Sequence, residues 1–313
     1  MNDQFRKDFW TLAREQKGYY SWAQRQGYQI SRAIGERRCR CLCEEKEQDA
    51  QNLVDQLFSN GFGGNPLFDC VFAGLARAES RFALRFVPQR SHEERLTGAL
   101  LAEMEAGLFL VKDEFQALSK QRYGEALEID FLHYDLSRGG KIEKETGGDL
   151  TIILSVDLPD MPRQLRYAAF QAKKLDRSAS IPKEQYHTLV SQFGDAAAYL
   201  FYDMYSKTAL PPMVLPAKGM SYKIGEDPKT SSCTLSQSDV EAGMPLSLWL
   251  LTKVAKGAVG AEAHSFYDAM DRFTHQKGMR NGRLAVLSIG RPIVLQTNND
   301  NGMTVDLGPS ACK

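Results

Sequence analysis

The chain has 313 residues, of which 43% are hydrophobic and 25% charged, as is usual for a globular protein. Its 39 basic residues balance its 39 acidic residues, so the net charge points to no class of partner. Its six cysteines lack the spacing of a zinc site or a disulfide framework. We find no signal peptide and no apolar run of the roughly 18 residues that span a membrane, and expect a cytoplasmic protein that does not contact membranes.

The sequence predicts a helical N-terminal region over residues 1–90. Apolar residues recur at helical spacing over 53–58 and again over 72–76. The glycine-rich stretch 61–66 separates these two segments. Because no catalytic pattern is visible here, we expect a helical wrapper or an interaction module.

A stronger helix is predicted from Ser91 onward. Ser91 and Glu94 match a capping box, in which two side chains bond to the backbone at a helix start. Gly107 is expected to bend the helix or to end its first half. The apolar stripe that would face the core comprises Leu96, Leu100, Met104, Val111, Phe115 and Leu118.

A β region follows, over 127–134, 150–156 and 165–173. A helix is predicted after Pro182, with an apolar face that extends to Phe201. Beyond Pro212 the pattern weakens.

For the rest of the chain we predict helices over 249–254 and 266–273, a strand over 284–289 and a loop over 297–313. The expected organisation is a helical region (1–90), an α/β core (91–210) and a C-terminal extension (211–313) that either joins the core or folds separately.

The residues that suggest chemistry lie at the ends of two predicted strands. A Gly-Gly-Asp tripeptide ending at Asp149 opens one strand, and Gln171-Ala172-Lys173 closes the next. Side chains alternate along a strand, so Gln171 and Lys173 project to one face. An amide and an amine at the end of a buried strand cost desolvation energy unless they are used. The plain alternative is an ordinary sheet, in which Asp149 closes a turn and the other two side chains reach solvent.

This arrangement resembles the PD-(D/E)xK nuclease superfamily, and in particular its Mrr-like members with a Gln-x-Lys signature. The likeness covers residues 91–205, about a third of the chain. It implies the α/β class, with a restriction-endonuclease-like mixed sheet flanked by helices, between the N-terminal helical region and the C-terminal extension.

The resemblance also implies a catalytic mechanism. Phosphodiester hydrolysis needs a divalent cation that neutralises the phosphate and acidifies a bound water, and Mg²⁺ or Mn²⁺ prefers oxygen ligands. Asp149 would supply an anionic oxygen, while the Gln171 side chain and the Ala172 carbonyl would supply neutral ones. Lys173 would orient or deprotonate the attacking water and stabilise the transition state.

Gln171 stands where most of the superfamily has Glu, which removes one negative charge from the metal site. A compensating acid is therefore expected on the helix that starts near Ser91. Glu94 matches the resemblance, although a capping role explains it equally well. Glu103 lies near the apolar stripe and is the competing candidate, although its side chain can also reach solvent from the edge of that stripe. We favour Glu94, for both metal binding and catalysis.

Two basic stretches in a neutral chain are typical of a phosphate-binding surface, although a solvated surface explains each equally well. The interval between Asp149 and Gln171 fits an extended β-ribbon, whose arginines would contact the substrate backbone. The segment 272–283 would bind phosphates in the same way. The residues assigned to nucleic-acid binding are Arg163, Arg166, Lys174, Arg272, Lys277, Arg280 and Arg283.

We therefore predict a metal-dependent nuclease that acts on DNA rather than RNA, and the resemblance implies a role in restriction or defence against phage. Two other functions fit the same residues. One is a non-catalytic nucleic-acid-binding module, which Gln at the metal position would explain. The other is an effector subunit that a co-encoded protein activates through the N-terminal helices. A homo-oligomer is compatible with all three.

Overall fold

The computed structural model describes residues 65–136, 148–204, 210–225, 231–274, 282–291, 294–298 and 302–306. The helices predicted before residue 65, and the expected phosphate ligands Lys277 and Arg280, lie outside these ranges. Over the described part the chain has an α/β fold in which helices flank a mixed eight-stranded sheet, which confirms the predicted class. Within these ranges no helix is both long and apolar enough to cross a membrane.

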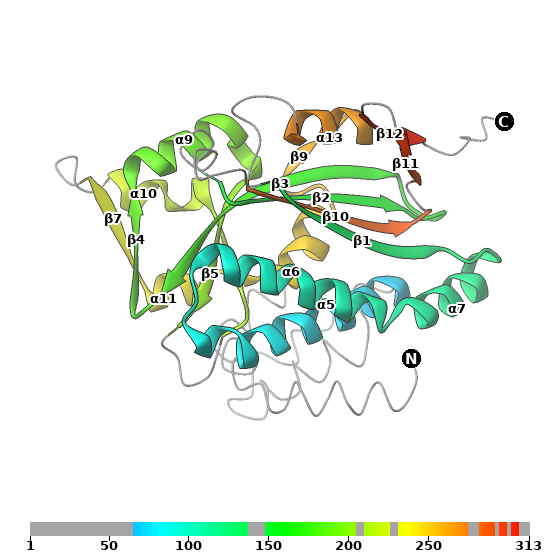
Figure 1. Cartoon of the computed structure of the whole chain (residues 1–313), viewed down its shortest axis with the longest axis horizontal. Coiled ribbons are helices and arrows are strands. Elements are labelled where there is room, and N and C mark those ends of the chain that lie inside the picture. The colour runs from blue at the N-terminus through cyan, green and yellow to red at the C-terminus, as the bar shows by residue number, and fades with distance from the viewer. Residues whose placement is uncertain are drawn as a thin grey trace, which may run out of the picture.

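The mixed sheet lies at the centre of the molecule (Figure 1). Its strands, in chain order, are β1 (Glu128–Asp135), β2 (Leu150–Asp157), β3 (Gln164–Leu175), β5 (Ala197–Asp203), β6 (Met213–Pro216), β8 (Met244–Pro245), β9 (Ala261–Glu262) and β10 (Arg283–Gly290). Their order across the sheet is β1-β10-β2-β3-β5-β6-β8, and the short β9 pairs with β3.

Strand β3 is long enough to pair with different strands along its two halves. From Gln164 to Phe170 it pairs antiparallel with β2. From Ala169 to Leu175 it pairs parallel with β5. The two partners therefore overlap only around residue 170, and the second half of β3 continues past the start of β2.

Strand β10 belongs to the predicted C-terminal extension yet lies inside the sheet. It is antiparallel to β1 and parallel to β2, and separates the two. The strand predicted over 284–289 is confirmed. Its central position depends on pairing with strands far away in sequence, which no local pattern reveals.

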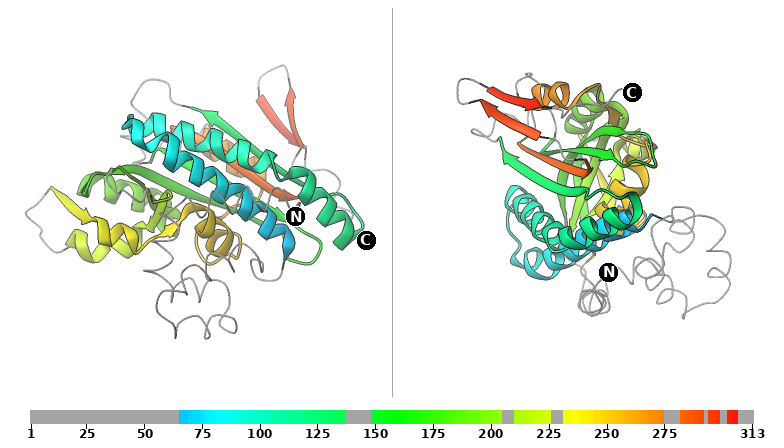
Figure 2. Two further views of the ribbon diagram at one scale, coloured as in Figure 1. Left: turned by 90° about the horizontal axis from the view of Figure 1, so that it is seen from below. Right: turned by 90° about the vertical axis from the view of Figure 1, so that its right-hand side faces the viewer.

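Helices cover both faces of the sheet (Figures 1 and 2). On one face lie α5 (Pro66–Arg85), α6 (Glu93–Phe109) and α7 (Lys112–Tyr123), and on the other lie α9 (Lys183–Phe193) and α13 (Phe266–Thr274). The ring of Tyr202 in β5 packs on Phe82 of α5, with centroids 5.2 Å apart. The ring of Tyr167 in β3 packs on Phe273 of α13 at 4.8 Å.

Shorter elements complete the described part of the chain. A two-stranded ribbon of β4 and β7 stands beyond the end of β3, and a second ribbon pairs β11 with β12 (Figure 1). The predicted loop over 297–313 is thus wrong for β11 and β12. These elements are η1 (Val87–Gln89), β4 (Ser178–Pro182), η2 (Gly194–Ala196), η3 (Ala217–Met220), α10 (Ser221–Gly225), β7 (Ser232–Ser236), α11 (Gln237–Glu241), α12 (Leu246–Trp249), the π-helical η4 (Leu250–Val254), β11 (Val294–Asn298) and β12 (Gly302–Asp306).

Strand β5 corrects another prediction. The spacing of apolar residues predicted one helix reaching Phe201, whereas α9 ends at Phe193 and residues 197–203 form a strand. Every residue of β5 is buried, and a fully buried strand shows the same apolar run as a buried helix. The chain changes direction at Gly194, where φ is +53°, a conformation that glycine adopts at little cost.

Helix α6 begins one residue later than the sequence predicted. The predicted capping box does not form, because His92 is the N-cap residue and its side chain makes no capping bond. Gly107 does not end the helix, which continues to Phe109. Instead α6 crosses α5 there: a Cβ atom on Gly74 would lie 2.9 Å from the Gly107 carbonyl oxygen. This backbone contact sets how closely α6 can approach α5.

A buried carboxyl group joins α5 to α12. Glu79 is 1% exposed, and its two oxygens accept from the Ser247 backbone N–H at 2.6 Å and the Ser247 hydroxyl at 2.7 Å. Burial raises the pKa of Glu79 to about 8. Two residues further along, Trp249 packs edge-on against Phe170 of β3 at 5.4 Å. The contact therefore anchors α12 beside the centre of β3.

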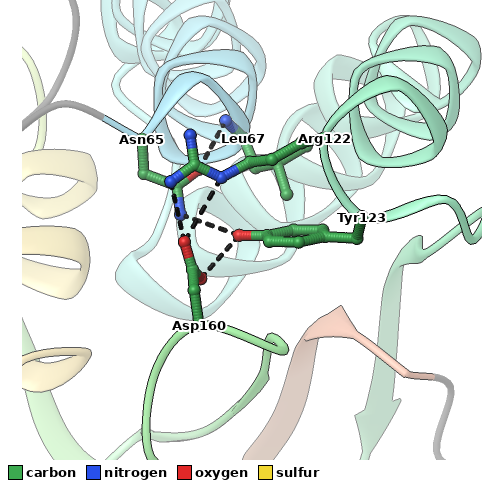
Figure 3. Close-up of polar contacts among 5 residues, drawn as sticks. All are labelled: Asn65, Leu67, Arg122, Tyr123 and Asp160. Carbon is green, nitrogen blue, oxygen red and sulfur yellow. Dashed lines mark hydrogen bonds and ion pairs between the residues drawn. The ribbon is translucent and has the colours of Figure 1, made fainter.

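The turn between β2 and β3 is held at the far end of the sheet by a polar cluster, the Asp160 clasp (Figure 3). Asp160 accepts from the Arg122 guanidinium at 2.7 and 3.2 Å and from the Tyr123 hydroxyl at 2.5 Å. Asn65 donates to that hydroxyl at 3.4 Å and accepts from the Leu67 N–H at 3.0 Å, which caps α5. The clasp thus ties this turn to the end of α7 and the start of α5.

Candidate active site

The residues predicted to be catalytic lie where β2 and β3 stop pairing. The first residue of β2 stands opposite Phe170, and β3 continues beyond it. The N–H groups of Ala172 and Lys174 therefore lie on an edge that no described strand covers. Asp149 Oδ2 accepts from the Ala172 N–H at 2.8 Å. Glu93 Oε1 accepts from the Lys174 N–H at 2.9 Å.

These bonds place two carboxylates in sequence along one strand edge. A strand rises about 3.3 Å per residue, so the two N–H groups lie roughly 7 Å apart. Asp149 is also fixed through its backbone: its N–H donates to the Phe170 carbonyl at 2.8 Å, and its carbonyl accepts from the Arg283 N–H at 2.9 Å. The carboxylate therefore projects from a residue held on both sides by neighbouring strands.

The side chain of Gln171 meets Asp149 directly. Gln171 is fully buried, and its Nε2 donates to Asp149 Oδ2 at 2.5 Å and to the Ala172 carbonyl at 3.2 Å. Its Oε1 is also buried and makes no hydrogen bond with any described residue. An unsatisfied buried acceptor costs about 1–3 kcal/mol. One end of this amide thus lies among oxygens, while the other lies without a partner in the described chain.

Lys173 projects to the same sheet face as Gln171, as strand alternation predicted. This is the face covered by α9 and α13, since Tyr167 lies on it as well. Lys173 is half-buried, and it makes no ion pair with a described residue. Lys174 projects to the opposite face, toward α6. The site therefore reaches both faces of the sheet, at the place where β3 continues past the start of β2. We call this place the gap between β2 and β3.

The acidic side chain of α6 that reaches β3 is Glu93, and the structure does not bring the predicted Glu94 to this edge. Glu94 is exposed, while Glu93 is half-buried and reaches the backbone of β3. The difference from the prediction is one residue: α6 starts after His92, and Glu93 rather than Glu94 turns toward the sheet.

The competing candidate, Glu103, lies outside the site. Its Oε2 pairs with the Arg81 Nε at 2.7 Å, in the contact between α6 and α5. Glu103 is 8% exposed. The carboxylate near the apolar stripe is thus explained by an ion pair between helices.

A buried tyrosine lies beneath the two carboxylates, on the α6 side. The hydroxyl of Tyr202 shares a 2.9 Å hydrogen bond with the Thr97 hydroxyl. Burial raises the pKa of Tyr202, the bond to Thr97 lowers it, the negative charges of Asp149 and Glu93 raise it and the positive charge of Arg283 lowers it. The charges of both carboxylates and of one cation therefore act on the Tyr202 hydroxyl.

Arg283 brings that cation to the site. Its guanidinium lies over Gly98 of α6, where an added Cβ would come within 3.2 Å of three guanidinium atoms. It also pairs with Asp135 at 3.1 Å. Arg283 was predicted to bind nucleic acid, and it lies next to Asp149 in the sheet.

The other described arginines assigned to the substrate lie elsewhere. Arg166 donates to the Val259 and Gly260 carbonyls, at 3.2 and 2.8 Å. Arg272 donates to the Tyr167 hydroxyl at 3.1 Å. Arg163 lies beyond the far end of β3 from Gln171, 3.9 Å from Asp157. In the structure these side chains contact the protein's own groups rather than the surroundings of Asp149, and their contact with a substrate backbone stays a prediction.

The oxygen atoms present fit a Mg²⁺-type ion. A half-turn of the Gln171 amide exchanges its oxygen and nitrogen, and this torsion has broad minima. The Gln171 oxygen would then stand where Nε2 stands now, beside Asp149 Oδ2 and the Ala172 carbonyl. With the amide turned in this way, a cation between the three oxygens would offset their mutual repulsion. The described residues contain no group of three or more His, Cys, Asp or Glu placed to hold a metal, so a metal at this point would depend partly on neutral oxygens.

Two features of the candidate site were not predicted from the sequence. Glu93 was missed because its role depends on where α6 starts. The position of Arg283 beside Asp149 was missed because it depends on β10 entering the sheet next to β2. A basic residue at the start of a predicted strand was the available signal.

Compared with known proteins, the chain matches no protein-family model, no curated protein and no solved structure.

Proposed function

We propose that this protein is a metal-dependent phosphodiesterase that cleaves DNA, with its active site at the gap between β2 and β3. The observation that supports it is the meeting of Asp149, the Gln171 amide and the Ala172 carbonyl on the open edge of β3. The Gly-Gly-Asp and Gln-x-Lys pattern formed by these same residues, with its resemblance to Mrr-like nucleases, also supports it.

In this proposal Asp149, Gln171 and the Ala172 carbonyl hold the ion, with Glu93 on the next part of the same edge. Bound there, Mg²⁺ would neutralise charge on the phosphate and lower the pKa of a coordinated water. Mg²⁺ is commonly held by one or two carboxylates together with substrate phosphates. A site with two carboxylates and two neutral oxygens is therefore expected to bind metal without substrate and to bind it more tightly once the substrate phosphate is present.

The remaining residues act on the substrate. Lys173 holds its ammonium on the same strand face as Gln171, where it can orient the attacking water and offset transition-state charge. Lys174 and Arg283 supply positive charge on the α6 side. The proposed site thus has positively charged side chains on both faces of the sheet, as expected where a phosphate backbone passes across the edge of the sheet.

The test is cleavage of supercoiled plasmid by the full chain with Mg²⁺ or Mn²⁺. We expect nicked or linear product that disappears with EDTA, with Asp149→Ala and with Lys173→Ala. The exposed ion pair between Asp195 and Lys218 supplies matched controls, and Asp195→Ala and Lys218→Ala should cleave as the unmodified protein does. Cleavage that persists without Asp149 would refute the proposed site. Cleavage of single-stranded RNA in place of plasmid would show that the substrate is RNA rather than DNA. The proposed reaction, phosphodiester hydrolysis, would still stand.

A non-catalytic binding module is the second candidate, and the direct Gln171–Asp149 bond favours it. In this arrangement the amide satisfies the carboxylate without a metal. The binding-only function predicts plasmid retention that weakens steeply with salt, no product with either cation, and unchanged retention when EDTA is added.

A further inference from the structure

Tyr199 of β5 is a buried residue beside the candidate metal site to which no role has yet been assigned. In the parallel ladder between β3 and β5 it stands opposite Gln171. Paired residues on neighbouring strands project to the same sheet face, about 4.8 Å apart. Tyr199 is fully buried, between the site and the elements α9 and β7.

Two polar atoms on these neighbouring side chains share one property. The Tyr199 hydroxyl and Gln171 Oε1 are both buried, and neither makes a hydrogen bond with any residue that the structure describes. Buried polar atoms are almost always bonded, so each such exception calls for an explanation. Two neighbouring exceptions, one of them on an expected metal ligand, indicate a shared cause.

The charge distribution places the hydroxyl near the site. Burial raises the pKa of Tyr199, and Cys233, Tyr186 and Asp149 raise it further through their charges. The phenol therefore senses the carboxylate that Gln171 contacts, as well as groups on β7 and α9.

We propose that the Tyr199 hydroxyl is a positioning partner of the Gln171 side-chain amide, through one water, and fixes which end of that amide faces Asp149. This inference rests on the proposed metal site. A hydroxyl group both donates and accepts, so it can serve the amide in either orientation. In the orientation that the structure shows, the hydroxyl makes no direct hydrogen bond to Oε1, and it would donate to that oxygen through the water. It accepts from Nε2 when the amide has turned and its oxygen faces the metal.

The need for such a partner is particular to glutamine. A glutamate in the same place has two equivalent oxygens, and either end can face a cation. A glutamine has one oxygen and one amide nitrogen, and the wrong end toward the metal removes a ligand. Residues that orient a metal ligand typically change metal affinity by about 10- to 100-fold when they are removed.

The experiment measures Mn²⁺ binding by electron paramagnetic resonance titration of the full chain. We expect Tyr199→Phe to weaken Mn²⁺ binding by about 10-fold while keeping the phenyl ring that fills the core. Tyr186→Phe is the matched control, since it removes a neighbouring hydroxyl that does not stand opposite Gln171, and it should bind as the unmodified chain does.

The second arm repeats Tyr199→Phe in a Gln171→Glu background. Because glutamate needs no orientation, the loss caused by Tyr199→Phe should shrink there to about threefold or less. A merely structural role for the hydroxyl would produce the same loss in both backgrounds. Thermal unfolding without metal checks that each variant is folded.

The outcomes separate the two levels of the argument. If the unmodified chain and Gln171→Glu both fail to bind Mn²⁺, the metal site itself is refuted, and this inference with it. If the unmodified chain binds Mn²⁺ and Tyr199→Phe binds equally well, the positioning role is refuted and the metal site stands. An equal loss in both backgrounds also refutes the positioning role.

Discussion

The β2–β3 pair carries an aspartate near each end, and the two carboxylates are satisfied in opposite ways. Asp160 lies at the exposed turn and accepts from a guanidinium and a phenol. Asp149 lies at the open end, where two neutral groups, an amide and a backbone N–H, donate to it. A second carboxylate, Glu93, is held close by on the same strand edge.

The comparison separates a structural carboxylate from the one that we propose to be functional. At the clasp, Arg122 supplies the opposite charge, and its bonds hold a turn in place. At the open end, two carboxylates are gathered where neutral donors fix their positions without cancelling their charge. Holding like charges together costs free energy that a bound cation would recover. The geometry of donors, more than the presence of an acid, distinguishes the two ends.

The largest expected effect comes from the same substitution at both ends. Asp149→Asn should lower plasmid cleavage about 1000-fold or more, because it removes the anionic ligand on which water activation depends. Asp160→Asn should leave the cleavage rate within about threefold, since it lies a full strand length away. Rates are compared at saturating Mg²⁺. Similar losses at both ends would mean that the chemistry does not belong to the open end.

A backbone substitution at the clasp end should cost stability without touching the chemistry. Gly290 has φ of +116°, and an added Cβ would overlap the Asp157 carbonyl. We expect Gly290→Ala to lower the free energy of unfolding by about 3 kcal/mol or more, measured by urea denaturation.

The control for this variant is Gly219→Ala, because Gly219 has open space around it. That change should alter the free energy of unfolding little. Cleavage by the folded fraction of Gly290→Ala should match the unmodified protein. A normal stability for Gly290→Ala would show that the end of β10 adjusts more readily than its contacts suggest.

Neighbouring glutamates on α6 sharpen the description of the open end. Glu93→Gln should raise the Mg²⁺ concentration for half-maximal cleavage about 10-fold, because a neutral side chain attracts the ion less. Glu94→Gln, one residue further and exposed, should leave it unchanged. The opposite ranking would restore Glu94 as the additional acid and contradict the helix start at Glu93.

The smallest expected effect concerns the clasp and pH. The Tyr123 hydroxyl, followed by Arg122, keeps the pKa of Asp160 below its usual range. A carboxyl with a lowered pKa stabilises the fold above its unfolded pKa of about 4, and this contribution is lost as pH falls through the folded value.

Because Asp160 is largely exposed, Asp160→Asn should lower the melting temperature at pH 7 by only about 2 °C or less. The difference between the two proteins should shrink as pH falls through the folded pKa of Asp160. A difference that grows on acidification would show that the clasp is not held by the ionised carboxyl. Differential scanning calorimetry across the pH range measures both quantities.

The sequence predicted the β strands of the open end well because their chemistry is local. Gln171 and Lys173 are two residues apart, and strand alternation alone places them on one face. Glu93 was missed by one residue, since the sequence pattern favoured Ser91 as the cap and the helix starts after His92. Helix ends are set by few interactions, and the side chain that we propose as the additional acid lies at one of them.

Predictions that depended on tertiary structure did less well. A buried strand and a buried helix present similar apolar runs, so β5 was assigned to the preceding helix. Charge in the sequence did not show that Arg166 and Arg272 are engaged by backbone carbonyls and a tyrosine. Knowing which arginines remain for a phosphate requires knowing which acceptors lie nearby.

The position of β10 between β1 and β2 has a consequence for the order of assembly. During synthesis β1, β2 and β3 emerge early, but the sheet cannot close until the last of its strands has left the ribosome. Arg283, the first residue of that strand, also delivers the N–H that fixes the Asp149 carbonyl. The proposed cleavage centre would thus be completed late, and a partly synthesised chain would lack the strand that aligns it.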